Sequence, residues 1–517
     1  GLDRASIIPR VGRVVHLIRA ERRCPSCSFG ESTRVFACPE EGHLTKVIKG
    51  GTVITATDTM QANVLIYGGK VVDIAQGSAQ TWAEGAERVI DATGKYVVPG
   101  AVDVHTHFEL PFGGTFVSDS FESGTRAAAH GGTTTIIDFA VQTKGEPMRA
   151  GFDTWMAKAE GNCAIDYGFH MIMSDVNDDS LKEMRELVDD GVTTFKLFMA
   201  YPGVLYSTDG EIFRAMQQAA EDGSMIMMHA ENGIAIDVLR EQAIARGETD
   251  PKYHTITRPP ATESEAVHRS LALAEVAGAP LYIVHMSAKE GVAELTLARD
   301  RGQNAFGETC PHYLHLSVED DIDVPGFEGA KYVCSTPIRF RAEGHQDALW
   351  DALIRGDLQI VSTDHADFFY DDDEEMGRQK RLGEGDFTLI PNGLPGVEER
   401  FQVMYQEGVV GGRFSLNRWI EMCCTAPAKM MGLYPQKGTI AVGSDADIVV
   451  YDPGTSFVYG TDTIHGNIDY TAYDGLEISG KVDTVLSRGN VIVENDTYIG
   501  TKGHGQYLKR GMNQYLV

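Results

Sequence analysis

Residues 99–114 read PGAVDVHTHFELPFGG, a short apolar run that ends in two histidines, His105 and His107. Side chains alternate along a β-strand, so both imidazoles are expected on one face, with a spacing of about 6–7 Å along the strand. That spacing suits two ligands of one metal ion. Two hydrogen-bonded core histidines fit the same pattern, so this pair alone leaves both interpretations open.

Seven further apolar runs of similar length follow, and amphipathic stretches such as residues 179–191, 210–223 and 263–278 lie between them. Alternation of short strands with helices predicts a parallel sheet with crossover helices. Eight strands over residues 99–435 favour a closed (β/α)8 TIM barrel over an open sheet. The further runs are TTIIDFA (134–140), DYGFHMIM (166–173), TTFKLFM (193–199), MIMMHAE (225–231), LYIVHMS (281–287), QNAFGETC (303–310) and LQIVSTD (358–364).

Both flanks of this central region have a different pattern. Residues 44–98 and 436–500 contain short β-rich runs separated by Gly-containing turns, which are typical of hairpins. A small β-sandwich built from both chain ends is the simplest arrangement of these pieces. We therefore expect an α/β protein with an N-terminal extension (1–43), the divided sandwich, the barrel (99–435) and a C-terminal arm (501–517).

Polar side chains of metal-binding type stand at the ends of several strands of the predicted barrel. The carboxyl ends of barrel strands converge on one face, where catalysis takes place. Each such residue taken singly also fits a packed core position, and Asp364 also fits a helix N-cap. Their succession on consecutive strands instead predicts one metal site, formed by His105, His107, Lys196, His229, His285 and Asp364.

Lys196 is the unusual member of this set because it lies in the middle of the apolar run FKLF. A buried ammonium group is costly. The alternatives are an ion-paired lysine, a neutral lysine of lowered pKa, or a lysine carboxylated by CO2. The last would turn a cation into a carboxylate that can bridge two divalent ions.

Composition excludes several classes of partner. The chain has 45 Lys and Arg against 74 Asp and Glu, a formal net charge of −29, which disfavours nucleic acid and anionic membranes. No apolar run reaches the 18 residues of a membrane-spanning helix. The 8 cysteines do not resemble a disulfide framework, so a cytoplasmic protein with reduced thiols is expected.

Three of the cysteines, Cys24, Cys27 and Cys38, lie in the N-terminal extension with a spacing close to that of a zinc knuckle. We interpret residues 1–43 as lying outside the folded enzyme subunit. The sequence leaves open whether this segment belongs to the native protein and whether it binds a metal.

From about residue 45 to 510 the chain resembles the amidohydrolase superfamily, and within it the dihydropyrimidinase/D-hydantoinase family. The metal-binding motif is shared by the whole superfamily, whereas the segments around Lys196 and Asn392 are more specific. The resemblance rests on PGAVDVHTHFELPFGG (99–114), FKLFMAYPG (195–203), MHAEN (228–232), IVHMSAKEG (283–291), GETCPHYL (307–314), STPIR (335–339), STDHADF (362–368), QKRLGEGDFTLIPNGLPGVEER (379–400) and GSDADIVVYDP (443–453).

The resemblance implies two Zn2+ ions per subunit, bridged by carboxylated Lys196. His105, His107 and Asp364 are expected to bind one ion, and His229 and His285 the other. Asp364 and Tyr201 are the expected catalytic residues, the first as proton shuttle and the second as a hydrogen-bond donor to the oxyanion. The expected substrate-binding residues are Tyr201, Ser335 and Asn392.

The activity implied is hydrolysis of a cyclic amide by a metal-bridging hydroxide. Candidate substrates are small cyclic ureides or imides: 5,6-dihydropyrimidines, which would place the enzyme in pyrimidine degradation, and 5-substituted hydantoins. Phe108 follows the histidine pair where carboxylate-binding relatives carry arginine, which disfavours an acidic substrate. An allantoinase-like activity and a non-enzymatic scaffold are the alternatives. The resemblance also implies a homotetramer, and the preferred ring and its stereochemistry stay open.

Overall fold

The computed structural model describes residues 45–516 except 78, 79, 372 and 374. The predicted extension 1–43, with Cys24, Cys27 and Cys38, lies outside the described residues. Within them, no helix is long and apolar enough to cross a lipid bilayer.

All eight predicted barrel strands are present, and each pairs in parallel with its neighbour in the described sheet. Their side chains are buried along the whole length of nearly every strand, as expected where helices cover the outer face. The strands are β6 (Ala101–Thr106), β9 (Thr133–Val141), β10 (Asp166–Ile172), β11 (Thr194–Phe198), β12 (Met225–His229), β13 (Leu281–Ile283), β14 (Ala305–Thr309) and β15 (Ile360–Val361).

The sheet closes between its first and last strands. Thr106 of β6 forms a parallel bridge with His365, four residues beyond the end of β15. The backbone N–H of His107 donates to the carbonyl of His365 at 2.9 Å. This confirms the predicted (β/α)8 barrel and brings the histidine pair of β6 next to the segment that carries Asp364.

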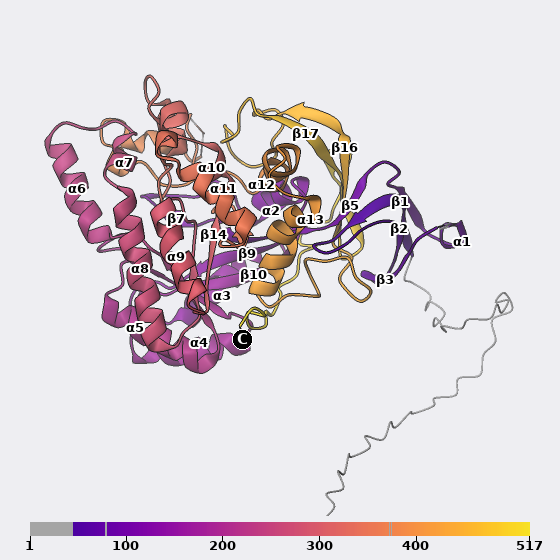
Figure 1. Cartoon of the computed structure of the whole chain (residues 1–517), viewed down its shortest axis with the longest axis horizontal. Coiled ribbons are helices and arrows are strands. Elements are labelled where there is room, and N and C mark those ends of the chain that lie inside the picture. Colours follow the sequence, from indigo (N-terminus) through magenta and orange to yellow (C-terminus); the bar gives the residue numbers. More distant parts are fainter. Residues whose placement is uncertain (1–44, 78–79, 372, 374, 517) are drawn as a thin grey trace, which may run out of the picture. The chain divides into compact units, whose positions relative to one another are not determined.

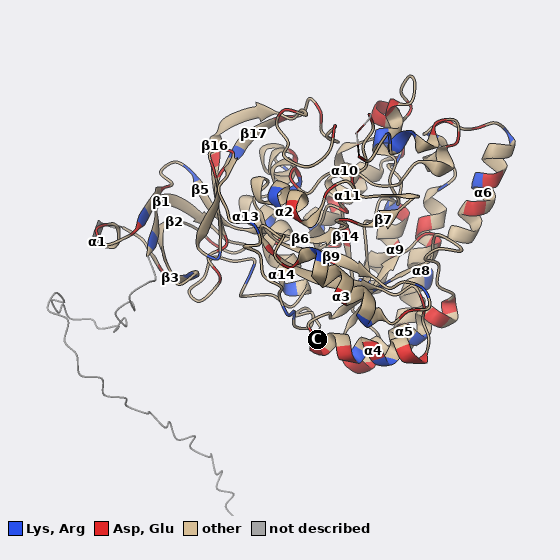
Figure 2. Cartoon of the chain, turned by 180° about the vertical axis from the view of Figure 1, so that it is seen from behind, with Lys and Arg blue, Asp and Glu red and all other residues tan. Residues whose placement is uncertain are grey.

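Helices cover the outside of the strands, with α5, α8 and α9 at the periphery of the barrel (Figure 1). Helix α4 shows why: Asn177 caps its first turn, Met184 and Leu187 face inward, and its other face is charged (Figure 2). The longer outer helices are α2 (Phe121–His130), α3 (Met148–Ala159), α4 (Asp178–Asp189), α5 (Asp209–Asp222), α6 (Gly233–Ala245), α8 (Pro260–Ala277), α9 (Lys289–Asp300) and α11 (His345–Arg355).

The strands of the two flanks form one mixed sheet, nine-stranded as far as the structure describes it. The junction is the antiparallel pair β5–β16, in which Val97 faces Val450 and Val98 faces Val449. Strands from both chain ends therefore lie side by side (Figure 1), which confirms a small β-unit built from both ends. Its strands are β1 (Lys46–Ile54), β2 (Thr59–Tyr67), β3 (Lys70–Ala75), β4 (Arg88–Asp91), β5 (Tyr96–Pro99), β16 (Ile448–Val458), β17 (Glu477–Ser487), β18 (Asn490–Glu494) and β19 (Thr497–Tyr498).

The predicted C-terminal arm lies against its own barrel. The backbone N–H of Leu508 donates to the carbonyl of Tyr167, which lies in the first half of strand β10. Arg510 is only 4% exposed and donates from Nη2 to the carbonyl of Phe169 at 2.6 Å and to Oγ1 of Thr194 at 2.8 Å. The arm is thus part of the packing at the amino-terminal end of these strands.

Candidate metal centre and active site

Five of the six predicted metal ligands lie at or just beyond the carboxyl ends of barrel strands, and Lys196 lies in the middle of its strand. Two of these positions, His285 and Asp364, have positive φ angles of 40° and 50°, a strained conformation for residues other than glycine that is characteristic of functional sites. His105 belongs to β6 and His107 follows it, Lys196 lies within β11, His229 ends β12, His285 comes two residues after β13 and Asp364 three residues after β15.

The side chains of these residues meet in one cluster. Asp364 Oδ1 lies 2.9 Å from His105 Nε2 and 3.2 Å from His107 Nε2. Lys196 Nζ lies 3.1 Å from the same His105 nitrogen. The ring of His285 contacts the rings of both His105 and His229. Its centroid lies 5.4 Å from that of the His105 ring and 4.6 Å from that of the His229 ring.

The protonation states in this cluster suit metal ligands. Burial holds the pKa of His285 well below its usual range and lowers the pKa of His107 to about 3, so both imidazoles are neutral. Burial also opposes ionisation of Asp364, but the charge and hydrogen bond of His105 outweigh it and hold the pKa of that carboxyl well below its usual range. Burial and Lys196 lower the pKa of His105, but the carboxylates of Asp364 and Glu308 outweigh them and raise it, so this imidazole must give up its proton to bind a metal. The neutral His107 and His285 and the ionised Asp364 are already in the forms that coordinate a cation.

Lys196 is 1% exposed, and Nζ lies 4.3 Å from the ring centre of Phe139 and 5.0 Å from that of Phe198. No carboxylate of the described residues lies within ion-pair distance of this nitrogen. Burial lowers the pKa of Lys196 to about 8.

Two buried nitrogens in the cluster, Nδ1 of His107 and Nδ1 of His285, have no hydrogen-bond partner among the described residues. Buried polar atoms are rarely left unpaired, so such atoms call for an explanation. Imidazoles and a carboxylate are the ligands preferred by zinc and similar divalent ions. The residues present therefore fit a metal centre.

The three predicted substrate-contacting side chains also meet. Asn392 Nδ2 lies 3.1 Å from Ser335 Oγ and 3.4 Å from the hydroxyl of Tyr201. All three line a cavity of about 920 Å³ whose wall also includes Lys196 and Asp364. Predicted metal ligands and predicted substrate-contacting residues thus line the same cavity.

Residues 96–492 match the sequence profile of the amidohydrolase family. The chain belongs to the amidohydrolase family. It is 61% identical over 472 residues to a D-hydantoinase of Streptomyces coelicolor, covering 91% of this chain and 99% of that protein. The crystal structure of dihydropyrimidinase from Brevibacillus agri superposes with a TM-score of 0.87 at 47% identity, over 91% of this chain and 99% of that one. For an L-hydantoinase from Arthrobacter aurescens the TM-score is 0.80 at 30% identity, with coverages of 90% and 99%.

The structure of this amidohydrolase adds two carboxylates that sequence reasoning missed. Glu308 accepts a hydrogen bond from His105 Nδ1 and another, at 2.8 Å, from the hydroxyl of Tyr282. Glu231 accepts from His229 Nε2 at 2.7 Å. Each carboxylate fixes the ring of a predicted metal ligand and leaves its other nitrogen free to bind an ion. Glu308 lies in β14, and Glu231 lies two residues after β12. Both carboxylates therefore follow the same strand-end pattern that predicted the metal ligands.

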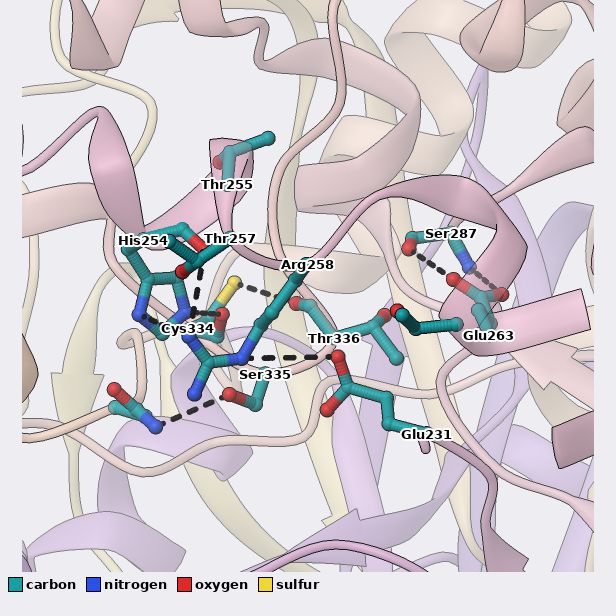
Figure 3. Close-up of polar contacts among 12 residues, drawn as sticks. Glu231, His254, Thr255, Thr257, Arg258, Glu263, Ser287, Cys334, Ser335 and Thr336 are labelled. Atoms are coloured by element: carbon teal, nitrogen blue, oxygen red, sulfur yellow. Dashed lines mark hydrogen bonds and ion pairs between the residues drawn. The ribbon is translucent and has the colours of Figure 1, made fainter. Parts of the chain in front are cut away.

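Glu231 is itself held by a buried arginine. Arg258 Nε lies 3.8 Å from Glu231 Oε1, and the two side chains point toward each other beside Ser335 (Figure 3). Both are at most 5% exposed, so the pair is shielded from solvent. A buried positive charge thus lies beside the carboxylate that contacts His229.

Replacing Glu231 with glutamine will weaken metal binding by about 10- to 100-fold, because the carboxylate that orients His229 is lost. Metal content after dialysis against graded chelator concentrations measures this change. Glu241→Gln, on the exposed face of α6, is the matched control and keeps the parental metal content. An unchanged metal affinity in Glu231→Gln would show that Glu231 does not support the site.

A second buried cluster, Asp119, His365 and Asp367, lies behind Asp364. Nδ1 of His365 accepts the backbone N–H groups of Gly396 and Val397 at 3.2 and 3.3 Å. Its proton is therefore on Nε2, which lies 3.3 Å from Asp119 and 3.2 Å from Asp367. Both carboxylates thus lie at ion-pair distance from this imidazole, and the cluster anchors the segment that carries Asp364.

Proposed function

We propose that this amidohydrolase opens the ring amide of 5-substituted hydantoins and 5,6-dihydropyrimidines, giving N-carbamoyl amino acids. With dihydrouracil the product is N-carbamoyl-β-alanine. The observation that carries the proposal is the shared cavity, in which the ligand cluster faces Tyr201, Ser335 and Asn392. The names of the relatives, D-hydantoinase and dihydropyrimidinase, point to the same chemistry.

We further propose that two zinc ions occupy the cluster. His105, His107 and Asp364 would hold one ion, and His229 and His285 would hold the other. Carboxylated Lys196 would be a ligand of both ions. The support for carboxylation is the burial of Lys196 without a carboxylate partner among the described residues. When bound, the ions supply a water molecule that is acidic enough to act as hydroxide at neutral pH.

The protein's own side chains perform the remaining tasks. Asp364 takes the proton of the attacking water and passes it to the ring nitrogen, which leaves only when protonated. Burial raises the pKa of Tyr201, so its hydroxyl keeps its proton and can donate to the developing oxyanion. Ser335 and Asn392 hold the N–H and C=O edge of the ring and so fix the attacked carbonyl in place.

Part of the cavity wall is apolar. Leu110, Phe112 and Phe116, in and beside the hairpin β7 (Pro111–Phe112) and β8 (Thr115–Phe116), line it together with Leu205. Phe108 lies beneath this wall, fully buried against Phe121. Such a wall fits a hydrocarbon substituent on the ring better than a charged one.

A panel of dihydrouracil, dihydrothymine, hydantoin, D- and L-phenylhydantoin and allantoin tests the proposal, with ring opening followed in the ultraviolet. Hydrolysis of hydantoins or dihydropyrimidines by the metal-loaded protein supports it. Turnover of allantoin alone would favour the allantoinase alternative, and no turnover of any ring would favour a non-enzymatic scaffold.

The substitution Asn392→Ala will raise KM about tenfold and leave kcat less affected, because it removes one hydrogen bond to bound substrate. Steady-state kinetics with the best substrate of the panel measure both constants. Asn304→Ala, at an exposed position before β14, is the control. A fall in kcat at constant KM would instead place Asn392 in the chemical step.

We also propose that the enzyme is a cytoplasmic homotetramer. Five described cysteines are buried free thiols, as expected for a reducing compartment: Cys163, Cys310, Cys334, Cys423 and Cys424. Light scattering of the purified protein tests the assembly, and the mass of a single chain would contradict it.

A further inference from the structure

Lys380, at the start of a short helical turn (Lys380–Gly383), is another fully buried lysine. Its Nζ donates to three backbone carbonyls: Val333 at 2.9 Å, Pro391 at 2.8 Å and Gly393 at 2.7 Å. No carboxylate oxygen of the described part of the chain lies within ion-pair distance of this nitrogen. A buried cation held only by carbonyl dipoles is expensive, so its presence calls for a role.

The three carbonyls belong to the two segments that carry substrate-contacting residues. Val333 lies two residues before Ser335, and Pro391 and Gly393 are the immediate neighbours of Asn392. The backbone N–H of Gly393 also donates to the carbonyl of Val333 at 3.0 Å. One ammonium group therefore links the segment 333–336, which carries Ser335, to the segment 391–393, which carries Asn392. The side chains of Ser335 and Asn392 themselves meet at 3.1 Å.

Other buried side chains hold the Ser335 segment alone. His254 Nε2 donates to the carbonyl of Cys334 at 2.8 Å, and the Tyr313 hydroxyl donates to that of Thr336 at 2.7 Å. Figure 3 shows His254 beside Cys334 and Ser335. Lys380 differs from His254 and Tyr313 because its side chain binds both segments. Its three tetrahedral N–H donors match three carbonyls, which the planar fork of arginine cannot reproduce.

We propose that Lys380 is a positioning residue that sets the separation between Ser335 and Asn392 and thereby the affinity for the ring. This inference rests on the proposed function, because it concerns the same substrate site. Lys380 does not line the cavity and acts only through the two segments. Its loss is therefore expected to affect substrate binding while the metal cluster stays intact.

The test compares kcat, KM and metal content of the metal-loaded parent with those of Lys380→Met and Lys380→Gln. Methionine keeps the volume without a donor, and glutamine keeps two N–H donors on a shorter chain. Lys380→Met is expected to raise KM about tenfold or more, with kcat within about threefold and metal content unchanged. The KM of Lys380→Gln should lie between that of Lys380→Met and that of the parent. Lys182→Met, at a side chain that is 73% exposed, is the control.

A double-mutant cycle separates positioning from general damage. Because Lys380 acts through Asn392, adding Lys380→Met to Asn392→Ala is expected to raise KM by much less than the product of the two single effects. A folded Lys380→Met with KM within twofold of the parent overturns the proposal, as do multiplicative effects on KM. Failure of both Lys380 variants to fold with parental metal content also overturns it, since Lys380 would then be a purely structural anchor.

The two proposals fail in different ways. A parent that opens no ring of the panel contradicts the proposed function and the role of Lys380 with it. An active parent whose KM is insensitive to Lys380 contradicts the role of the lysine alone.

Discussion

Replacing Asp364 with asparagine will lower kcat by about a thousandfold or more. General acid–base groups contribute about 10²- to 10⁴-fold, and Asp364 is also an expected metal ligand. Its Oδ1 lies 2.9 Å from His105 and 3.2 Å from His107, so an amide there disturbs both contacts and cannot accept the proton of water. No other carboxylate of the described residues is placed to replace it at both histidines.

Steady-state kinetics on the best substrate, together with metal analysis, measure this effect. Asp351→Asn on helix α11, where the side chain is 66% exposed, serves as the control and should match the parent. Normal turnover by Asp364→Asn would remove Asp364 as the proton shuttle. Loss of metal with loss of turnover would show that ligation is its main contribution.

The second large effect is expected for Lys196→Ala, which should lose metal and nearly all activity. The proposal gives Lys196 an anionic, bridging form, and alanine leaves the two metal positions without a shared ligand. Lys196 is 1% exposed and lies 3.1 Å from His105, so bulk solvent cannot easily supply a substitute. A drop in kcat of at least about a thousandfold follows, since the hydroxide generated by the ions is lost.

Two companion measurements separate carboxylation from charge. Lys196→Arg keeps a cation that cannot form a carbamate, and it should be as inactive as the alanine variant. Lys196→Ala supplied with zinc and a short-chain carboxylic acid should regain part of its activity, because the acid supplies the missing carboxylate. Full activity in Lys196→Arg would show that a positive charge suffices and would contradict the carboxylated lysine.

The barrel and the ligand cluster could be predicted from the sequence because both follow a repeating rule. Apolar runs alternate with amphipathic helices, and ligand-type residues recur where the runs end. Parallel barrel strands must converge at that end, so His105 and Asp364 meet at 2.9 Å although 259 positions separate them in the sequence. The same rule contains Glu231 and Glu308, which became recognisable only once their partners, His229 and His105, were seen.

The remaining part of the site obeys no such rule. Tyr201, Ser335 and Asn392 lie in loops, where no periodicity relates a residue to its neighbours in space. Only the resemblance to known sequences points to these three residues. Nothing in the sequence points to Lys380, because a lysine in a polar loop sequence gives no sign that it will be buried. Burial of such a residue depends on distant segments, here those around Val333 and Pro391.

The pairing of β5 with β16 has a consequence for biosynthesis. Val97 emerges from the ribosome long before its partner Val450, and the contacts of Arg510 with the barrel form later still. Strands β1 to β5 must therefore persist with an unpaired edge while more than three hundred further residues are translated. A nascent chain of this protein has its greatest need of chaperones during that interval, which ends when β16 emerges and covers the edge of β5.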